Sequence, residues 1–196
     1  MYRLLSIFIC VLSFRFVYSL SEVEQACVNA HNNLLDNSFL IGTWYSICNF
    51  ASRLNLPSSS YCKETIIKNA TESDLQRYRE GYPLENPFNF DDNPVISESF
   101  RHKGMIMGHM EAKFYVFDPE NYFYKQDKYI VKVFRKVSED YVLEHECRLR
   151  GEFRSLMSRK RHVSKEELER VISTLDKDVR DMETLIICYS SSSSSS

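Results

Sequence analysis

The alternation of apolar and polar residues between residues 41 and 158 predicts a series of β-strands. In the first strand Trp44, Ser46, Cys48 and Phe50 fall on one face, because successive side chains of a strand point to opposite faces. Turn-forming residues separate the segments that follow, and a stretch at 83–94 with three prolines is predicted to be a long loop. The predicted strands are residues 41–51, 61–68, 75–82, 95–107, 110–117, 129–137, 141–149 and 152–158.

A helical pattern replaces the alternation from Ser164 onward. Ser164 and Glu167 have the spacing of a capping box, in which the serine oxygen accepts an amide hydrogen at the helix start. The apolar residues that follow recur at helical spacing and form one stripe: Leu168, Val171, Ile172 and Leu175. We therefore predict one helix after the strands, packed on their outer side, and then a segment at 185–189 that returns to the sheet.

Short connections without helices between successive strands favour an antiparallel, up-and-down sheet. Eight such strands can close into a barrel just wide enough for one small ligand. Closure also removes exposed strand edges, which otherwise promote aggregation. The predicted fold class is all-β: an eight-stranded antiparallel up-and-down barrel with one C-terminal α-helix packed on the outside.

The first 19 residues have the features of a signal peptide: a basic start, an apolar run at 4–14, and small or short residues at Val17 and Ser19. A membrane anchor is the alternative, but the apolar run is shorter than the roughly 20 residues of a spanning helix. No later segment has the composition of a membrane span. We expect a secreted, extracellular protein with a barrel domain at 20–189 and a low-complexity serine tail at 190–196.

Charge and cysteine content narrow the function. Without Arg3 and Arg15 of the leader, 23 Lys and Arg stand against 27 Asp and Glu, a net charge of −4, which argues against nucleic-acid binding. Five cysteines remain after the leader, so two disulfides and one thiol are the simplest arrangement, and spacing alone leaves the pairing open. None has the close spacing of a structural zinc site, and we expect no metal and no cofactor. Asn69-Ala70-Thr71 is a glycosylation sequon.

The chain resembles a lipocalin, of the kind that includes apolipoprotein D and the insect bilin-binding proteins. This resemblance rests on Gly42-x-Trp44-Tyr45, on the segment Leu156-Met157-Ser158-Arg159 before the capped helix, and on the cysteine positions. It implies that Arg159 packs over Trp44 at the barrel floor, next to Gly42, as a cation–π contact. It also implies the disulfides Cys27–Cys147 and Cys62–Cys188, with Cys48 as the free thiol. The Thr-Asp-Tyr motif that lipocalins usually carry before the seventh strand is only faintly present, as Asp140-Tyr141.

The resemblance implies a protein that carries, stores or sequesters a small hydrophobic molecule, such as a pigment or lipid, and is not an enzyme. Apolar walls with a few polar groups are typical of small-molecule pockets. The candidate interior residues are Cys48, Phe50, Phe100, Phe114, Tyr115, Phe117, Tyr129 and Phe134. An alternative of another class is a secreted interaction or inhibitor protein that binds a protein target through exposed loops, which the loop at 83–94 favours slightly.

Three further hypotheses involve polar side chains. An inward histidine among His102, His109 and His145 could bind haem iron, although strand histidines more often lie at the surface or fill space. A thiol at Cys48 could bond a bilin or act in a small isomerase, although buried free cysteines are usually inert. Glu144 and Glu146 could recognise an amine, but a solvated outer face is the preferred interpretation for both.

Overall fold

The computed structural model describes residues 20–30, 35–51, 62–82, 93–100, 102–108, 112–120, 129–148 and 151–188. The predicted signal peptide, the serine tail, most of the proline-rich loop and His109 lie outside the described residues.

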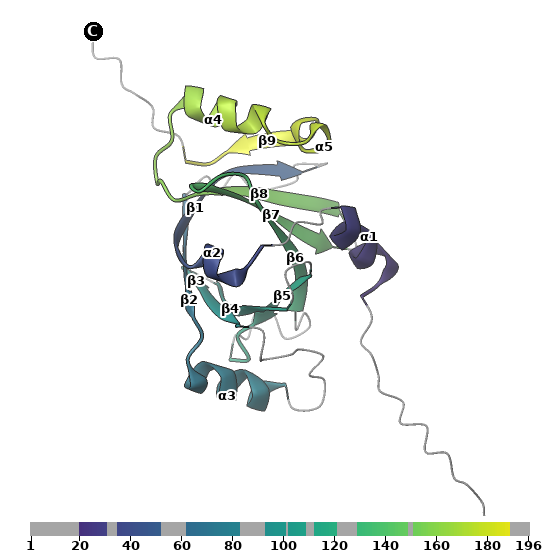
Figure 1. Ribbon diagram of the computed structural model, residues 1–196, viewed down its shortest axis with the longest axis vertical. Helices are drawn as coiled ribbons and strands as arrows, with labels where there is room; N and C mark the ends of the chain where they lie inside the picture. Colours follow the sequence, from purple (N-terminus) through teal and green to yellow (C-terminus); the bar gives the residue numbers. More distant parts are fainter. Residues whose placement is uncertain are drawn as a thin grey trace, which may run out of the picture.

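Eight strands form a closed, all-antiparallel up-and-down barrel, which confirms the predicted fold class (Figure 1). They are β1 Gly42–Ala51, β2 Lys63–Asn69, β3 Val95–Ser99, β4 His102–Met107, β5 Lys113–Phe117, β6 Tyr129–Lys136, β7 Tyr141–Arg148 and β8 Gly151–Ser158. Each strand pairs with the next, and β1 closes the barrel by pairing with both β2 and β8. A short extra strand, β9 (Glu183–Ile186), pairs with the last four residues of β1.

The predicted strand at 75–82 is wrong, because this segment is the helix α3 (Glu72–Gly81). Thr71 caps the helix: its hydroxyl accepts from the Asp74 amide at 3.2 Å, and the Asp74 carboxylate accepts from the Thr71 amide at 3.0 Å. Leu75 and Tyr78 then pack against the outer face of the barrel. The number of strands is nevertheless eight, because the segment predicted as one strand at 95–107 folds back at Phe100 into β3 and β4.

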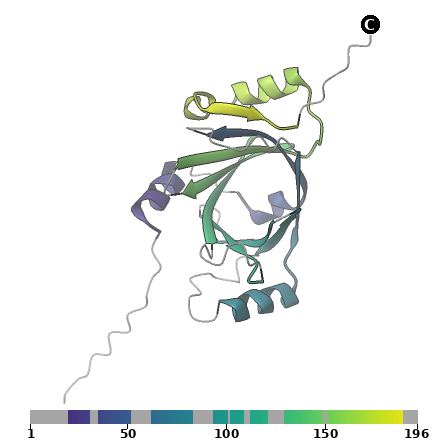
Figure 2. The same ribbon diagram turned by 180° about the vertical axis from the view of Figure 1, so that it is seen from behind.

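Of the other helices, α1, α4 and α5 lie outside the barrel, and α2 lies across one of its ends (Figures 1 and 2). They are α1 Glu22–Ala30, α2 Asn37–Leu40, α4 Lys165–Ser173 and α5 Lys177–Arg180. The predicted C-terminal helix is α4, which lies with α5 over β1 and β9, on the side opposite α3. The Ser164 hydroxyl accepts from the Glu167 amide at 3.1 Å, as the capping pattern predicts. The Glu167 carboxylate does not complete the box, because it accepts from Tyr141 and Lys160, each at 2.8 Å.

Two disulfides tie the outer segments to the barrel, and both are the pairs that the resemblance implies. Cys27–Cys147 joins α1 to β7, and Cys62–Cys188 joins the residue before β2 to the segment after β9. Among the described cysteines Cys48 is the free thiol, and it is buried. Such disulfides are typical of proteins in oxidising compartments. None of the helices in the described part of the chain is long and apolar enough to cross a bilayer.

Candidate functional site

The floor of the barrel is built around Trp44, which is fully buried. Its indole nitrogen donates to the Leu40 carbonyl of α2 at 2.7 Å. The Arg159 guanidinium lies 3.8 Å from the centroid of the Trp44 ring and donates to the carbonyls of Ile41 and Phe39, each at 2.8 Å. The short helix α2 therefore lies across one end of the barrel and is held there by contacts to both side chains (Figure 1).

Gly42 is required at this floor for two reasons. Its φ of +120° is a conformation that residues with a side chain rarely adopt. A Cβ atom at this position would also lie 2.3 Å from Nη1 of Arg159. Glycine at residue 42 therefore lets the guanidinium approach the backbone and reach its two carbonyl partners.

A bulge in β1 changes which side chains point into the barrel in the second half of the strand. The register with β8 shifts between Ser46 and Cys48, so that Asn49 lines the interior while Cys48 and Phe50 join the outer cluster beneath α4. The prediction that Cys48 and Phe50 line the cavity, made from strict alternation, is therefore wrong. Burial raises the pKa of the Cys48 thiol to about 12, and this thiol does not face the cavity where a ligand would lie.

The remaining aromatic candidates divide between the two faces of the wall. Tyr115 and Phe117 line the cavity, and Phe134 lies inside the barrel in the cluster around Trp44. The predictions for Phe114 and Tyr129 are wrong, because these rings pack against each other in clusters on the outer face, with centroids 5.7 Å apart. The prediction for Phe100 is also wrong: it lies at the turn between β3 and β4 and is 84% exposed.

The barrel encloses a cavity of about 330 Å³ above this floor. This volume is at the lower end of the range of small-molecule sites. The apolar and aromatic lining residues are Tyr115, Phe117, Ile130, Phe153, Met157 and Ile187. The polar lining residues are Ser46, Asn49, Lys63, Thr65, Ser97, Ser99, His102, Lys132, Glu144, Glu146 and Ser155. The expectation of apolar walls with few polar groups is thus wrong, because polar side chains predominate.

An ion-paired cluster occupies one wall. The Lys132 amino group lies 2.6 Å from Glu144 and 3.6 Å from Glu146, and 4.6 Å from the centroid of the Tyr115 ring. Burial alone would lower the pKa of Lys132, but the two carboxylates outweigh it and raise this pKa. The preferred interpretation of Glu144 and Glu146 as solvated outer residues is wrong, because both face the cavity.

Lys63 is the second lysine of the cavity, and its environment differs from that of Lys132. No ion pair or hydrogen bond links its amino group to any residue in the described ranges. Burial lowers the pKa of Lys63, and the positive charge of Lys132 lowers it further, against a raising effect of the two glutamates. Lys63 therefore makes no direct ion pair in this part of the chain, although Glu144 and Glu146 act on its amino group over a longer distance.

Two further polar groups of the cavity lack partners. Asn49 on β1 lies directly opposite Ser155 on β8. The Asn49 side-chain oxygen and the Ser155 hydroxyl are both buried without a hydrogen bond. Buried polar atoms in native proteins are nearly always hydrogen-bonded, so this pair is an exception. Both atoms have almost no accessible surface, so a molecule in the cavity could reach them only if neighbouring atoms moved.

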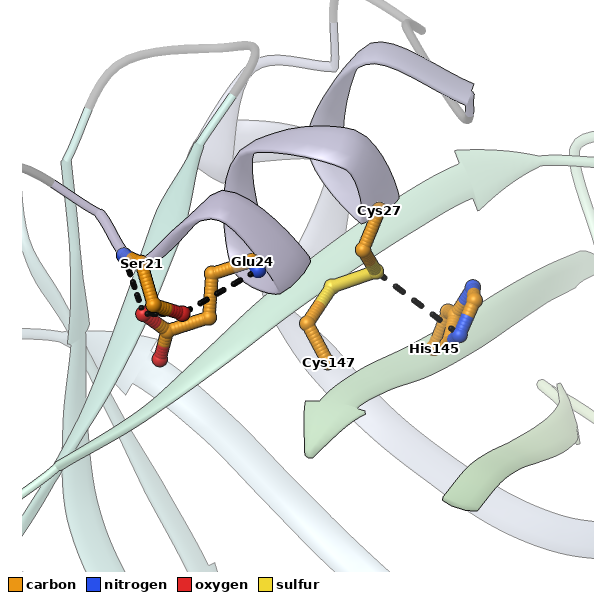
Figure 3. Close-up of a disulfide and its surroundings, with 5 residues drawn as sticks. All are labelled: Ser21, Glu24, Cys27, His145 and Cys147. Carbon is orange, nitrogen blue, oxygen red and sulfur yellow. Dashed lines mark hydrogen bonds between the residues drawn. A yellow bond between two sulfur atoms is a disulfide. The ribbon is translucent and has the colours of Figure 1, made fainter. Parts of the chain in front are cut away.

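One of the histidines considered for haem points inward, so that hypothesis stays a prediction. His102 lines the cavity, whereas His145 points outward from β7, with Nε2 lying 3.8 Å from the Cys27 sulfur (Figure 3). Cys27, His145 and Cys147 bring their donor atoms within 4.8 Å of one another. Because the two sulfurs are bonded to each other, they are not thiolate ligands, and this cluster is not a metal site in the oxidised protein.

Sequence reasoning missed Asn49, Lys63, Lys132 and Ser155. Lys132 had a visible signal, since it is a lone charge within the apolar run from Ile130 to Phe134. Asn49 and Ser155 had none, because their inward direction depends on the bulge in β1 and on the pairing of β1 with β8.

Comparison with models of known protein families and with curated protein sequences finds no match for this chain. The class of protein is therefore defined by the fold and the cavity alone: a closed β-barrel of the kind that can hold a small ligand in its interior. The lipocalin assignment remains a prediction from the residues around Trp44 and Arg159 and from the cysteine positions.

Proposed function

We propose that this protein is a lipocalin-like extracellular binding protein that carries, stores or sequesters a small molecule in its barrel. The observation that carries the proposal is the cavity of about 330 Å³ above a floor closed by Trp44 and Arg159. Aromatic and aliphatic side chains would bury the apolar part of the ligand, at roughly 25 cal/mol per Å² before entropic costs. The ligand is amphiphilic rather than wholly hydrophobic, because charged and hydroxyl groups line the same cavity.

The extracellular location rests on three observations. The N-terminal segment has the sequence of a signal peptide, and the two disulfides suit an oxidising compartment. Asn69 of the sequon lies at the end of β2 and is exposed, so a glycan could be attached there without disturbing the barrel. We include N-glycosylation of Asn69 in the proposal.

The alternative function, binding of a protein target, is favoured by one observation. Phe100 is 84% exposed and Ile66 is 45% exposed. Together with Glu64 and Glu98 they line a shallow groove on the outside of β2 and β3. An exposed apolar patch of this kind can mark an interaction surface.

The two functions can be separated with a neutral fluorescent probe, N-phenylnaphthylamine, and one cavity-filling variant. Ser97 on β3 lines the cavity, so Ser97→Trp would fill it. Glu98→Trp is the matched control, since Glu98 lines the outer groove on the same strand. Probe binding to the wild type and to Glu98→Trp, but not to a folded Ser97→Trp variant, would support the interior site. Equal binding by all three proteins would contradict it.

Native mass spectrometry of protein from its natural source provides a second test. A retained small molecule of defined mass is the expected result. Protein that is always empty, and that also fails to bind the probe, would favour the protein-binding alternative.

A further inference from the structure

The outer face of β7 and the helix α1 bring three potential metal ligands together. His145 and Cys147 lie two residues apart on β7, so their side chains leave the same face of the strand. Glu144 and Glu146 line the cavity, which places His145 and Cys147 on the outside of the barrel. Cys27 reaches the same place from α1 (Figure 3). One donor atom from each of Cys27, His145 and Cys147 lies within 4.8 Å of the other two.

The spacing of these atoms suits a tetrahedral zinc ion. With Zn–S bonds of about 2.3 Å and a Zn–N bond of about 2.0 Å, tetrahedral geometry separates sulfur from nitrogen by about 3.5 Å and the two sulfurs by about 3.8 Å. The Nε2 atom of His145 already lies 3.8 Å from the Cys27 sulfur. The two sulfurs are joined in a disulfide, and after reduction each needs to move by about 1 Å, which rotation of the side chains can supply.

Contacts other than the disulfide also position α1 and β7. The strand is paired with β6 on one side and with β8 on the other. Val28 of α1 is 4% exposed and packs in one cluster with Val131 and Val133 of β6. The Ser21 hydroxyl accepts from the Glu24 amide at 3.3 Å, and the Glu24 carboxylate accepts from the Ser21 amide at 2.9 Å, which caps the first turn of α1. The disulfide is therefore one of several contacts that hold α1 on this wall.

The three side chains can be reached from solvent on one side. Cys27 is half-buried, whereas His145 and Cys147 are buried. A water molecule can take the fourth position on the side of Cys27, as in open zinc sites with three protein ligands. Arg154 lies opposite His145 on β8, but its guanidinium is paired with Asp178 at 2.8 Å, so its charge opposes a bound cation only weakly.

We propose that Cys27, His145 and Cys147 form a zinc site when the disulfide between the two cysteines is reduced. A dithiol reductant supplies two electrons and two protons to the disulfide and is itself oxidised to a disulfide. Each protein thiol then loses its proton as its sulfur binds Zn²⁺, and the neutral imidazole donates its Nε2 lone pair. Thiolate and imidazole ligands favour zinc over calcium and magnesium.

The site would bind or release zinc according to the redox state of the protein. Oxidation by a small disulfide, which takes up the two electrons and leaves as two thiols, re-forms the Cys27–Cys147 bond and releases the ion. The site lies on the opposite face of β7 from the cavity, so this inference is independent of the proposed function.

Metal titrations of the full chain, with and without a phosphine reductant, test the proposal. Co²⁺ is the spectroscopic probe, because thiolate-to-cobalt absorption bands report bound sulfur, and Zn²⁺ is then added to displace it. Reduced wild type should bind a single ion, and the oxidised protein should not bind. His145→Ala and Cys27→Ser should each weaken zinc binding by more than about tenfold, because even changes behind the ligands cost about 10–100-fold.

Two controls separate this site from the other disulfide. His162 is exposed and follows Arg161, whose carbonyl oxygen lies 3.8 Å from the Cys62 sulfur, so His162→Ala is the matched control and should leave zinc affinity unchanged. The double variant Cys62→Ser/Cys188→Ser removes that disulfide and should keep zinc binding. Thermal unfolding provides a second measurement. Zinc at about 100 times its dissociation constant should raise the melting temperature of reduced wild type by about 5–10 °C, and should not do so for reduced His145→Ala.

Three results would overturn the proposal. The first is reduced wild type that binds no more zinc than the oxidised protein and gains no thermal stability from it. The second is equal zinc affinity in wild type and His145→Ala. The third is loss of zinc binding in folded Cys62→Ser/Cys188→Ser. Binding of N-phenylnaphthylamine by the oxidised protein is a separate measurement, so failure of the zinc site would leave the small-molecule carrier intact.

Discussion

Replacing Gly42 by alanine tests how the floor of the barrel is held closed. The new Cβ atom would lie 2.3 Å from Nη1 of Arg159, so the guanidinium must move. Movement weakens its hydrogen bonds to the carbonyls of Ile41 and Phe39 and its stacking on Trp44. The backbone at residue 42 would also be strained, because its φ is +120°.

The size of the effect follows from these two contributions. Backbone strain of this kind costs roughly 1–3 kcal/mol. Hydrogen bonds to a charged group contribute about 1.5–3 kcal/mol each when fully lost, but Arg159 is only half-buried and water would replace part of them. We expect Gly42→Ala to lower the free energy of unfolding by about 3 kcal/mol, and the melting temperature by about 6–12 °C.

Urea unfolding followed by tryptophan fluorescence measures this directly, because Trp44 is the only tryptophan of the chain. Repeating the substitution in an Arg159→Ala background provides the control. There the clash is absent, so Gly42→Ala should cost only the backbone strain. The reasoning would be refuted if Gly42→Ala cost less than about 0.5 kcal/mol, or if its cost were the same in both backgrounds.

Three further predictions concern buried charges and the thiol. Lys113 is 1% exposed and burial lowers its pKa to about 8, so the unfolded chain, with a pKa near 10.5, binds more protons. The free energy of unfolding of the wild type should therefore rise by about 2–3 kcal/mol between pH 7 and pH 10, relative to that of Lys113→Met. Denaturant titrations at several pH values measure this, and the same pH dependence for the two proteins would contradict it. Lys132→Met leaves the two cavity glutamates without their cation and should cost about 2–4 kcal/mol, against less than about 1 kcal/mol for Lys68→Met; equal losses for the two variants would refute this ranking. Iodoacetamide should label Cys48 in denaturant but not in the native protein, as mass spectrometry can check, and rapid native labelling would show that the thiol is accessible.

The barrel could be predicted from the sequence because its strongest signals are local. Alternating residues define most strands, Gly42 and Trp44 mark the first strand, and Ser164 marks the start of α4. The error at α3 also had a local signal, since Thr71 and Asp74 have capping-box spacing and Leu75 and Tyr78 have helical spacing. The fold-back at Phe100 had none, because no glycine or proline lies at that turn.

The cavity could be predicted only in part, because it depends on which face of each strand is inward. The alternation correctly places Glu144 and Glu146 on the same face of β7. It does not show that this face points into the barrel, where Glu144 pairs with Lys132 of β6. The bulge after Ser46 depends on the pairing of β1 with β8, and it moves Asn49 inward. The polarity of the site is therefore a property of the tertiary structure, which the sequence of each strand alone does not carry.

A crystal structure of the protein grown with N-phenylnaphthylamine tests the central claim, that the interior of the barrel is the ligand site, most directly. The account predicts electron density for the aromatic rings of the probe among Tyr115, Phe117 and Phe153. Density for the compound in the outer groove beside Phe100, or a cavity filled by the protein's own side chains, would contradict it.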